Sequence, residues 1–322
     1  MNNIFTKISI KERTLFAKRL AFLIKAGVPI VESLRILRGQ SKTGAKAKVL
    51  DEVIKDVSNG QFLSSSLAKF QNNFDQFAVN LIRIGEESGT LDKNLEYLAN
   101  ELKKKQELQR KVWGALVYPI FIIVATLGIA GLLTIFIFPK ILPIFASLNV
   151  KLPITTRFLI WVSDFLKSYG IYLIFALFGL AVAWGFLLRK ERFKFWTHRA
   201  VFKVPRLGAI FKNYHLANIC RTLGLLLKSD IRIVRAFTIA SATTTNLVYR
   251  RELNKVANGV TEGAKITAYM EKHPKLFPHI LTHMIEIGES TGKLDETLIY
   301  LSEMYEAEVD ELTKNLSTVL EP

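Results

Sequence analysis

The sequence predicts an all-α membrane protein: two homologous cytoplasmic helical bundles of about six helices each, joined by two transmembrane helices and a short outer loop. Three observations lead to this class. Two long stretches carry no charge, the segments on either side of them repeat one another without a gap, and apolar residues recur at helical spacing with almost no strand-like alternation.

The two uncharged stretches predict the spans. Residues 112–139 make a run of 28 residues, and residues 168–188 make one of 21. A helix needs about 20 apolar residues to cross a bilayer, so both are long enough. Neither run contains Asp, Glu, Lys, Arg or His, which argues against an ion or proton pathway through them.

Basic residues predict the orientation. The net charge is +16, and Lys and Arg gather before the first span and after the second, whereas the loop 140–167 holds four. Positive charge favours the cytoplasmic side, so domains 1–111 and 189–322 are expected in the cytoplasm. The residues nearest the spans are expected to face anionic lipid, at about 1 kcal/mol each: Lys103, Lys104, Lys105, Arg110, Lys111, Arg189, Lys190, Arg192 and Lys194.

The two cytoplasmic segments are related by an offset of 203 residues. Residues 82–99 and 285–302 share 10 identities in 18 positions, and the same offset superimposes Gly60 on Gly263 and Phe74 on Phe277. Apolar positions at helical spacing and breaks at Gly27, Gly60 and Gly89 divide the first copy into helices. Whether the helix that begins at Leu91 continues into the first span is left open.

The repeated motif, G-E-x-S/T-G-x-L-D, provides the candidate site residues. Its glycines are expected at positions of close approach or positive φ, and its acids are expected to order the turn between two helices by meeting helix N-terminal amides. The motif comprises Gly85, Glu86, Gly89, Leu91 and Asp92 in the first copy, and Gly288, Glu289, Gly292, Leu294 and Asp295 in the second. Calcium binding by these acids is the alternative interpretation.

At this motif the chain resembles a family: the F protein of type II secretion systems, which is also the inner-membrane platform protein of type IV pili. Phe16, Leu20, Leu23, Gly27 and Pro29 are similar to the family's opening pattern. The second copy departs from it, with Ser229, Asp230 and Arg232 in place of Ala26, Gly27 and Pro29, so its first turn is left open. The resemblance covers residues 10–322.

The resemblance implies a bacterial inner-membrane, multi-pass protein that couples a cytoplasmic hexameric ATPase to pilin or pseudopilin assembly and catalyses no reaction itself. Implied partners are the assembly or retraction ATPase, pilin subunits, other inner-membrane assembly proteins and a second copy of the chain. Whether the system builds pili, secretes proteins or takes up DNA is left open. The alternative function is a membrane-anchored transporter or enzyme.

The sequence gives little support for phosphate binding, metal binding, catalysis or nucleic-acid binding. The glycines of 39–44 have no preceding strand and are followed by Ala45-Lys46 rather than by the Lys-Ser or Lys-Thr of a phosphate loop. His279, His283 and Glu286 have metal-capable spacing, but Gln76, Asn80 and Arg83 occupy the same slots in the first copy. No catalytic residue, metal site or cofactor is therefore predicted, and no nucleic-acid module is recognisable. The one cysteine, Cys220, aligns with Ala17 and is predicted to be a small core residue.

The repeat also predicts a third span. Pro322 aligns with Pro119, which stands in the opening turns of the first span. A repeat unit that leads into the bilayer once is expected to do so twice. We therefore expect a further apolar run after Pro322, and fraying of the last helix near Leu320 where that run is missing.

Overall fold

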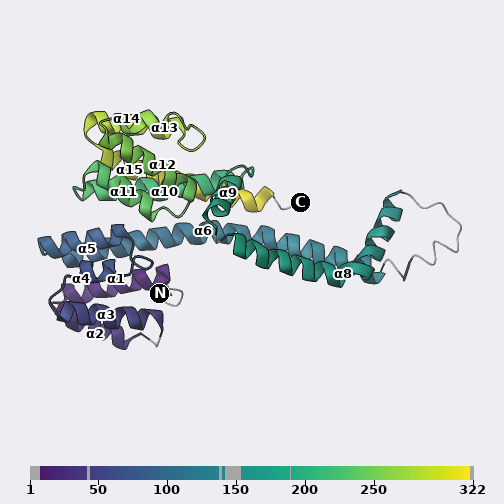
Figure 1. The fold of residues 1–322 in the computed structure, drawn as a ribbon, viewed down its shortest axis with the longest axis horizontal. Helices are drawn as coiled ribbons and strands as arrows, with labels where there is room; N and C mark the ends of the chain where they lie inside the picture. The colour runs from purple at the N-terminus through teal and green to yellow at the C-terminus, as the bar shows by residue number, and fades with distance from the viewer. Residues whose placement is uncertain (1–7, 42–43, 138–139, 142–153, 189, 320–322) are drawn as a thin grey trace. The chain divides into compact units, whose positions relative to one another are not determined.

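The computed structural model describes residues 8–41, 44–137, 140–141, 154–188 and 190–319, which form helices and turns only (Figure 1). Two units are compact in themselves: residues 1–112 with 201–313, and residues 113–200 with 314–322. Both repeat copies therefore belong to the first unit. The all-α class and the two repeat halves are confirmed.

The first repeat copy contains six helices. Their bounds are α1 Ile10–Lys25, α2 Ile30–Gly39, α3 Ala45–Ser58, α4 Leu63–Ala68, α5 Gln76–Ser88 and the start of α6 Leu91–Leu132. Ser9 begins α1 with a reciprocal cap, in which its hydroxyl accepts from the Glu12 amide and the Glu12 carboxylate accepts from Ser9. Leu20, Leu34 and Leu63 are fully buried in the core between these helices.

The second repeat copy has the corresponding helices. Their bounds are α10 Leu207–Lys228, α11 Ile233–Thr243, α12 Leu247–Thr261, α13 Ile266–Met270, α14 His279–Thr291 and α15 Leu294–Val319. Adding 203 to the ends of α1, α3 and α5 gives the ends of α10, α12 and α14. The predicted gapless offset therefore holds at these three helix ends as well as for the residues.

The first turn of the second copy, which the sequence left open, is the same turn as in the first. Gly27 has φ +82°, and Asp230 takes its place at φ +57°. The amide of Val28 donates to the Leu23 carbonyl at 3.0 Å, and the amide of Ile231 donates to the Leu226 carbonyl at 3.1 Å. Aspartate is among the few residues with a side chain that visit this left-handed region routinely.

Helix α6 is a single helix of 42 residues, so the continuation that the sequence left open does occur. It contains Pro119 and is followed by a π-helical turn, Leu133–Ile137. Among the described residues, α6 is the one helix found long and apolar enough to cross a membrane, and none of its apolar stretch is buried. A buried core helix would show the opposite pattern.

The second predicted span lies in α8 Ile154–Leu187, which α9 Glu191–Val201 follows. Helix α8 begins well before residue 168, so part of the segment predicted as the outer loop is helical. The Ser163 hydroxyl donates to the Thr134 carbonyl at 2.7 Å and ties α8 to the π-helical turn. Residues 142–153 of the loop, Arg189, and the chain end at Leu320 with any span after it lie outside the described residues.

Candidate functional site

The two motif turns have the backbone geometry that glycine permits. Gly89 and Gly292 close α5 and α14 in the left-handed conformation, with φ values of 69° and 72°. One turn earlier, Gly85 and Gly288 allow a close helix crossing. A β-carbon on Gly85 would lie 2.9 Å from the Cα of Leu91, which is closer than real β-carbons approach other atoms.

In the second copy the crossing is slightly different. A β-carbon on Gly288 would lie 2.8 Å from Oγ1 of Thr297 and 3.1 Å from the Cα of Leu294. The nearest atom is thus a side-chain hydroxyl rather than backbone. Leu294 is buried, whereas its counterpart Leu91 is half-buried.

The acids of the motif differ between the copies. The Glu86 carboxylate accepts from the backbone amides of Leu63 at 2.5 Å and Ser64 at 2.9 Å, the first two residues of α4. Glu86 therefore meets helix N-terminal amides, but those of α4 rather than those of the helix after the turn. In Glu289, Oε2 is buried and has no hydrogen-bond partner among the described residues.

Asp92 and Asp295 stand in the first turns of α6 and α15, where a negative charge interacts favourably with the helix N-terminus. The described residues contain no group of three His, Cys, Asp or Glu placed to hold a metal ion. His279 and His283 are exposed, and Glu286 lies 3.7 Å from the Lys265 ammonium.

A buried ionic cluster connects the two repeat copies. From α10, Arg221 donates through Nε to Oε1 of Glu306 in α15 at 2.9 Å, and through a terminal nitrogen to Oε2 of Glu101 in α6 at 3.3 Å. Arg221 and Glu101 are 9% and 7% exposed. A buried charge without its partner is strongly destabilising, so this cluster fixes the first copy against the second.

The electrostatic effect of this cluster extends to Tyr97. Burial, reinforced by the negative charge of Glu101, raises the pKa of Tyr97 to about 12, while the positive charge of Arg221 opposes the rise. Sequence comparison of the copies does not reveal the cluster, because Glu101, Arg221 and Glu306 align with Met304, Lys18 and Lys103.

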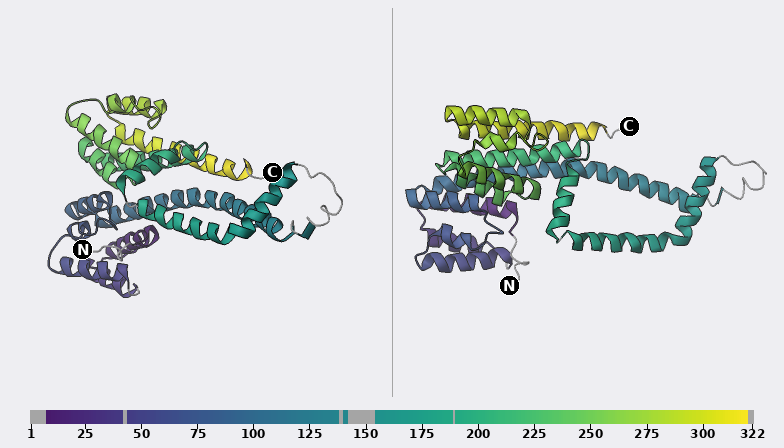
Figure 2. Two further views of the ribbon diagram at one scale, coloured as in Figure 1. Left: turned by 45° about the vertical axis from the view of Figure 1, so that its right-hand side comes forward. Right: turned by 45° about the horizontal axis from the view of Figure 1, so that its top comes forward.

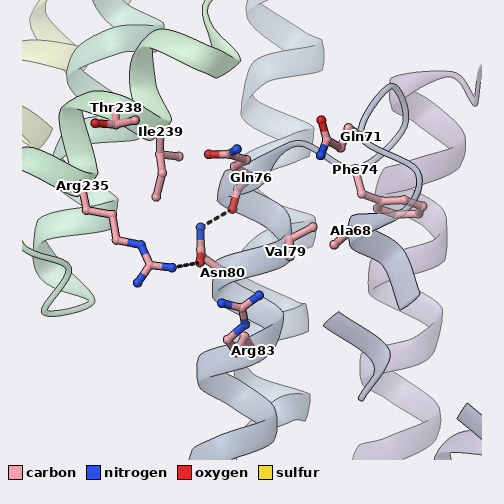
Figure 3. A pocket seen from close by; sticks show the side chains of 10 residues that line it. All are labelled: Ala68, Gln71, Phe74, Gln76, Val79, Asn80, Arg83, Arg235, Thr238 and Ile239. Carbon is pink, nitrogen blue, oxygen red and sulfur yellow. Dashed lines mark hydrogen bonds between the residues drawn. The ribbon is translucent and has the colours of Figure 1, made fainter. Parts of the chain in front are cut away.

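Helices α5 and α11 form a second contact between the copies (Figure 3). Arg235 of α11 donates to the Asn80 side-chain oxygen at 3.3 Å, and Asn80 donates to the Gln76 carbonyl at 2.7 Å. Together with Arg83 and Ile239, these residues line a cavity of about 290 Å³. Gln76, Asn80 and Arg83 are the polar slots that the repeat aligns with His279, His283 and Glu286.

Four of the basic residues predicted to face lipid also lie near acids. Lys111 lies 2.6 Å from Asp310 of the second copy, and the ammonium groups of Lys103, Lys104 and Lys105 lie 3.7 to 3.9 Å from carboxylates of the first copy. Exposed basic side chains near the spans also include Arg110, Lys190, Arg192 and Lys194. Arg189 lies outside the described residues, and lipid contact stays a prediction for all of them.

Cys220 occupies the core position expected for it. It is buried like Ala17, its counterpart in the first copy. Burial raises the pKa of its thiol to about 12.

Comparison with known proteins identifies the family of this chain. The family model for protein F of the type II secretion system matches residues 16–139 and 219–322. The two matches begin 203 residues apart, which is the offset of the repeat. Both copies thus carry the family's pattern independently.

The curated relatives align along nearly the whole chain. The type IV pilus assembly protein PilC of Thermus thermophilus is 33% identical over 313 residues, covering 97% of this chain and 77% of the relative. PilC of Pseudomonas aeruginosa is 30% identical over 317 residues, covering 98% and 84%. Type II secretion system protein F of Pseudomonas aeruginosa is 33% identical over 291 residues, covering 90% and 72%. The chain therefore belongs to the family of type II secretion system protein F and its type IV pilus counterpart PilC.

Proposed function

We propose that this chain is a non-enzymatic inner-membrane platform that couples a cytoplasmic hexameric ATPase to the assembly of pilin or pseudopilin subunits. The observation that carries the proposal is α6. One uninterrupted helix begins at the motif turn of the first copy and continues into an apolar, uncovered stretch suited to a bilayer. A cytoplasmic domain from which such a helix leads into the bilayer is a suitable receiver for motion from a motor.

Within residues 1–322 the proposed topology has two spans, α6 and α8, with both repeat copies in the cytoplasm. The supporting evidence is the uncharged run 168–188 within α8 and the excess of Lys and Arg before the first span and after the second. Anionic lipid headgroups are the proposed partners of Arg110, Lys190, Arg192 and Lys194, whose side chains are exposed.

The proposed partners are the assembly ATPase, pilin or pseudopilin subunits, other inner-membrane assembly proteins, and further copies of this chain. Relatives named for type IV pilus assembly and for type II secretion reach the same identity of 33%. The role shared by both systems is therefore the one proposed, and the neighbouring genes would decide between pilus formation, secretion and DNA uptake.

Crosslinking in cells tests this function. Photo-crosslinkers placed at exposed positions of the two repeat copies should capture the ATPase. Capture only from the loop 144–156 would contradict the topology. If deletion of the gene abolished neither pilus formation nor secretion, the proposed function would be contradicted. The competing class, a membrane-anchored enzyme or transporter, predicts nucleotide hydrolysis by the purified chain alone.

A further inference from the structure

The cavity beside the contact between α5 and α11 has no role in the platform function. The two helices belong to different repeat copies and lie side by side within the first unit (Figures 1 and 2). The cavity measures about 290 Å³. Pockets that bind small molecules begin at about 300 Å³, so this one is large enough for a small ligand, and its lining determines which kind.

Two arginines line the cavity, one from each repeat copy. Arg83 belongs to α5 and Arg235 to α11, and the described residues of the lining include no acid. Asn80 neighbours both of them (Figure 3). It stands three residues before Arg83, on the same face of α5, and its side-chain oxygen accepts from Arg235 at 3.3 Å. Two positive charges therefore meet here without a negative charge in the lining.

Most hydrogen-bond donors of the two guanidinium groups are unused. Within the part of the chain that the structure describes, Arg235 donates only to Asn80, and Arg83 forms no hydrogen bond or ion pair. A guanidinium group carries a planar set of N–H donors that fits the oxygens of phosphate and carboxylate groups. Arg83 is also half-buried, so water reaches it less freely than an exposed arginine. An anion placed between the two groups would supply the missing acceptors.

The opposite side of the cavity is apolar. Phe74 and Val79 are buried, Ala68 is half-buried, and all three line the cavity. Figure 3 shows Ala68 and Phe74 on the far side of Val79 from the two arginines. The exposed amides of Gln71 and Gln76 complete this part of the lining and can both donate and accept. A matching ligand therefore carries an anionic group at one end and an apolar group at the other.

The charge of the lining favours a phosphate monoester over other anions. At neutral pH such a group carries about two negative charges and offers three acceptor oxygens, which matches two guanidinium groups on separate helices. A carboxylate carries a single charge and offers fewer acceptors. Inorganic phosphate has the matching charge but leaves the apolar side of the cavity unused, and burial of apolar surface is favourable.

We propose that this cavity binds a small organic phosphate. The phosphate group lies between Arg83 and Arg235, and an apolar or aromatic group of the ligand lies against Phe74 and Val79. Such a ligand contacts both repeat copies at once, so it stabilises the arrangement in which α5 and α11 are packed together. The site goes beyond the platform function and does not depend on it.

Calorimetric titration of the full chain in a non-ionic detergent tests the site, with phenyl phosphate as the probe. The net charge of +16 attracts any anion, so inorganic phosphate and benzoate are titrated at the same ionic strength for comparison. We expect phenyl phosphate to bind about tenfold more tightly than either, because only it fills both sides of the cavity with matching chemistry. Equal affinity for inorganic phosphate would show general attraction of anions, and equal affinity for benzoate would show that the double charge is not recognised. Either result, or no binding at all, would overturn the proposal.

Substitution of the two arginines locates the binding. Arg83→Gln and Arg235→Gln should each weaken phenyl phosphate binding about tenfold, because each removes charge-assisted hydrogen bonds to the phosphate. Arg35→Gln is the matched control. It removes the same charge from an exposed position of α2 outside the cavity and should leave the affinity unchanged. Equal affinity of the parent and all three variants would place the binding elsewhere and overturn the proposal.

A further variant keeps both arginines and changes only the group beside them. Asn80→Asp places a carboxylate where it competes with the phosphate for Arg83 and Arg235, so phenyl phosphate should again bind about tenfold less tightly. Each variant is first shown to keep the parent's thermal unfolding transition. A folded Asn80→Asp chain that binds like the parent would overturn the proposal. Because the measurement is binding by the purified chain, its outcome is independent of pilus formation or secretion.

Discussion

The backbone carbonyls of Asn73 in the first copy and Leu276 in the second occupy equivalent positions, yet they are satisfied from different helices. The Asn73 carbonyl accepts from the Arg13 guanidinium of α1 at 2.8 Å, and the Leu276 carbonyl accepts from the Tyr249 hydroxyl of α12 at 2.9 Å. A buried carbonyl needs a partner, but any donor within reach can serve. The two copies have kept the acceptor and exchanged the donor.

The link between the third and fourth helices shows the same exchange. In the first copy, Asp56 of α3 accepts from the Ser66 hydroxyl at 2.5 Å and from the Lys69 ammonium at 2.7 Å, and these bonds lower the pKa of the Asp56 carboxyl. In the second copy, Glu252 of α12 accepts from the Tyr269 hydroxyl. The comparison teaches that glycine turns and apolar positions hold the repeat constant, whereas its buried polar bonds are specific to each copy.

The largest expected effect comes from Arg221, which has no functional equivalent in the first copy. Arg221→Met leaves the buried Glu101 carboxylate with only the exposed Lys104 ammonium, 3.7 Å away, and should lower the free energy of unfolding by up to about 3–5 kcal/mol. Chemical unfolding of the full chain in detergent measures this. Lys18→Met, at the equivalent exposed position, is the control and should change little.

A second variant separates lost packing from the stranded charge. Adding Glu101→Met, which introduces the residue found at the equivalent position 304, should recover most of the loss because no buried charge remains. A double variant as unstable as Arg221→Met would show that the cluster acts through packing rather than through charge.

The next largest difference in unfolding free energy is expected between variants of the two motif glutamates. Glu86→Gln weakens two charge-assisted bonds to the start of α4 and should cost about 1.5–3 kcal/mol. Glu289→Gln should cost close to nothing, since its buried Oε2 has no partner among the described residues. Equal losses in the same unfolding assay would mean that the two glutamates have the same role.

The same substitution at the two helix crossings should also lower the stability by unequal amounts. Gly85→Ala places a methyl group against the Leu91 backbone and should cost about 1–3 kcal/mol through overpacking. Gly288→Ala first meets the Thr297 side chain, which can rotate, so a smaller loss is expected. Thermal unfolding of the two variants beside the parent provides the comparison, and a larger loss for Gly288→Ala would contradict it.

The smallest effect is expected at the first turn. Asp230→Gly removes the steric strain of a left-handed residue that carries a side chain, but it also adds conformational freedom to the unfolded chain. We therefore expect the free energy of unfolding to rise by less than about 1 kcal/mol. Gly27→Asp, the reverse change at φ +82°, should lose a similar amount. A large loss for Asp230→Gly would show that the aspartate side chain itself holds the turn.

Sequence reasoning predicted what the two copies share. The offset and the breaks at Gly60 and Gly89 follow from residues whose physical constraint is local, a left-handed φ, and the first uncharged run follows from the absence of charge over a bilayer's thickness. The Glu101–Arg221–Glu306 cluster was missed because the copies do not share it. The polar slots at Gln76, Asn80 and Arg83 were recognised, but no pattern along the chain indicates that α11 lies opposite them.

The burial of Cys220 has a practical consequence. It is the only thiol in the sequence, and with its pKa raised to about 12 it is both covered and protonated at neutral pH. A thiol reagent can therefore modify the native protein only when α10 opens. The rate of modification then reports the opening equilibrium of the second repeat copy. Comparing that rate in empty membranes and in membranes with a working motor would show whether ATP turnover loosens this bundle, without any engineered label.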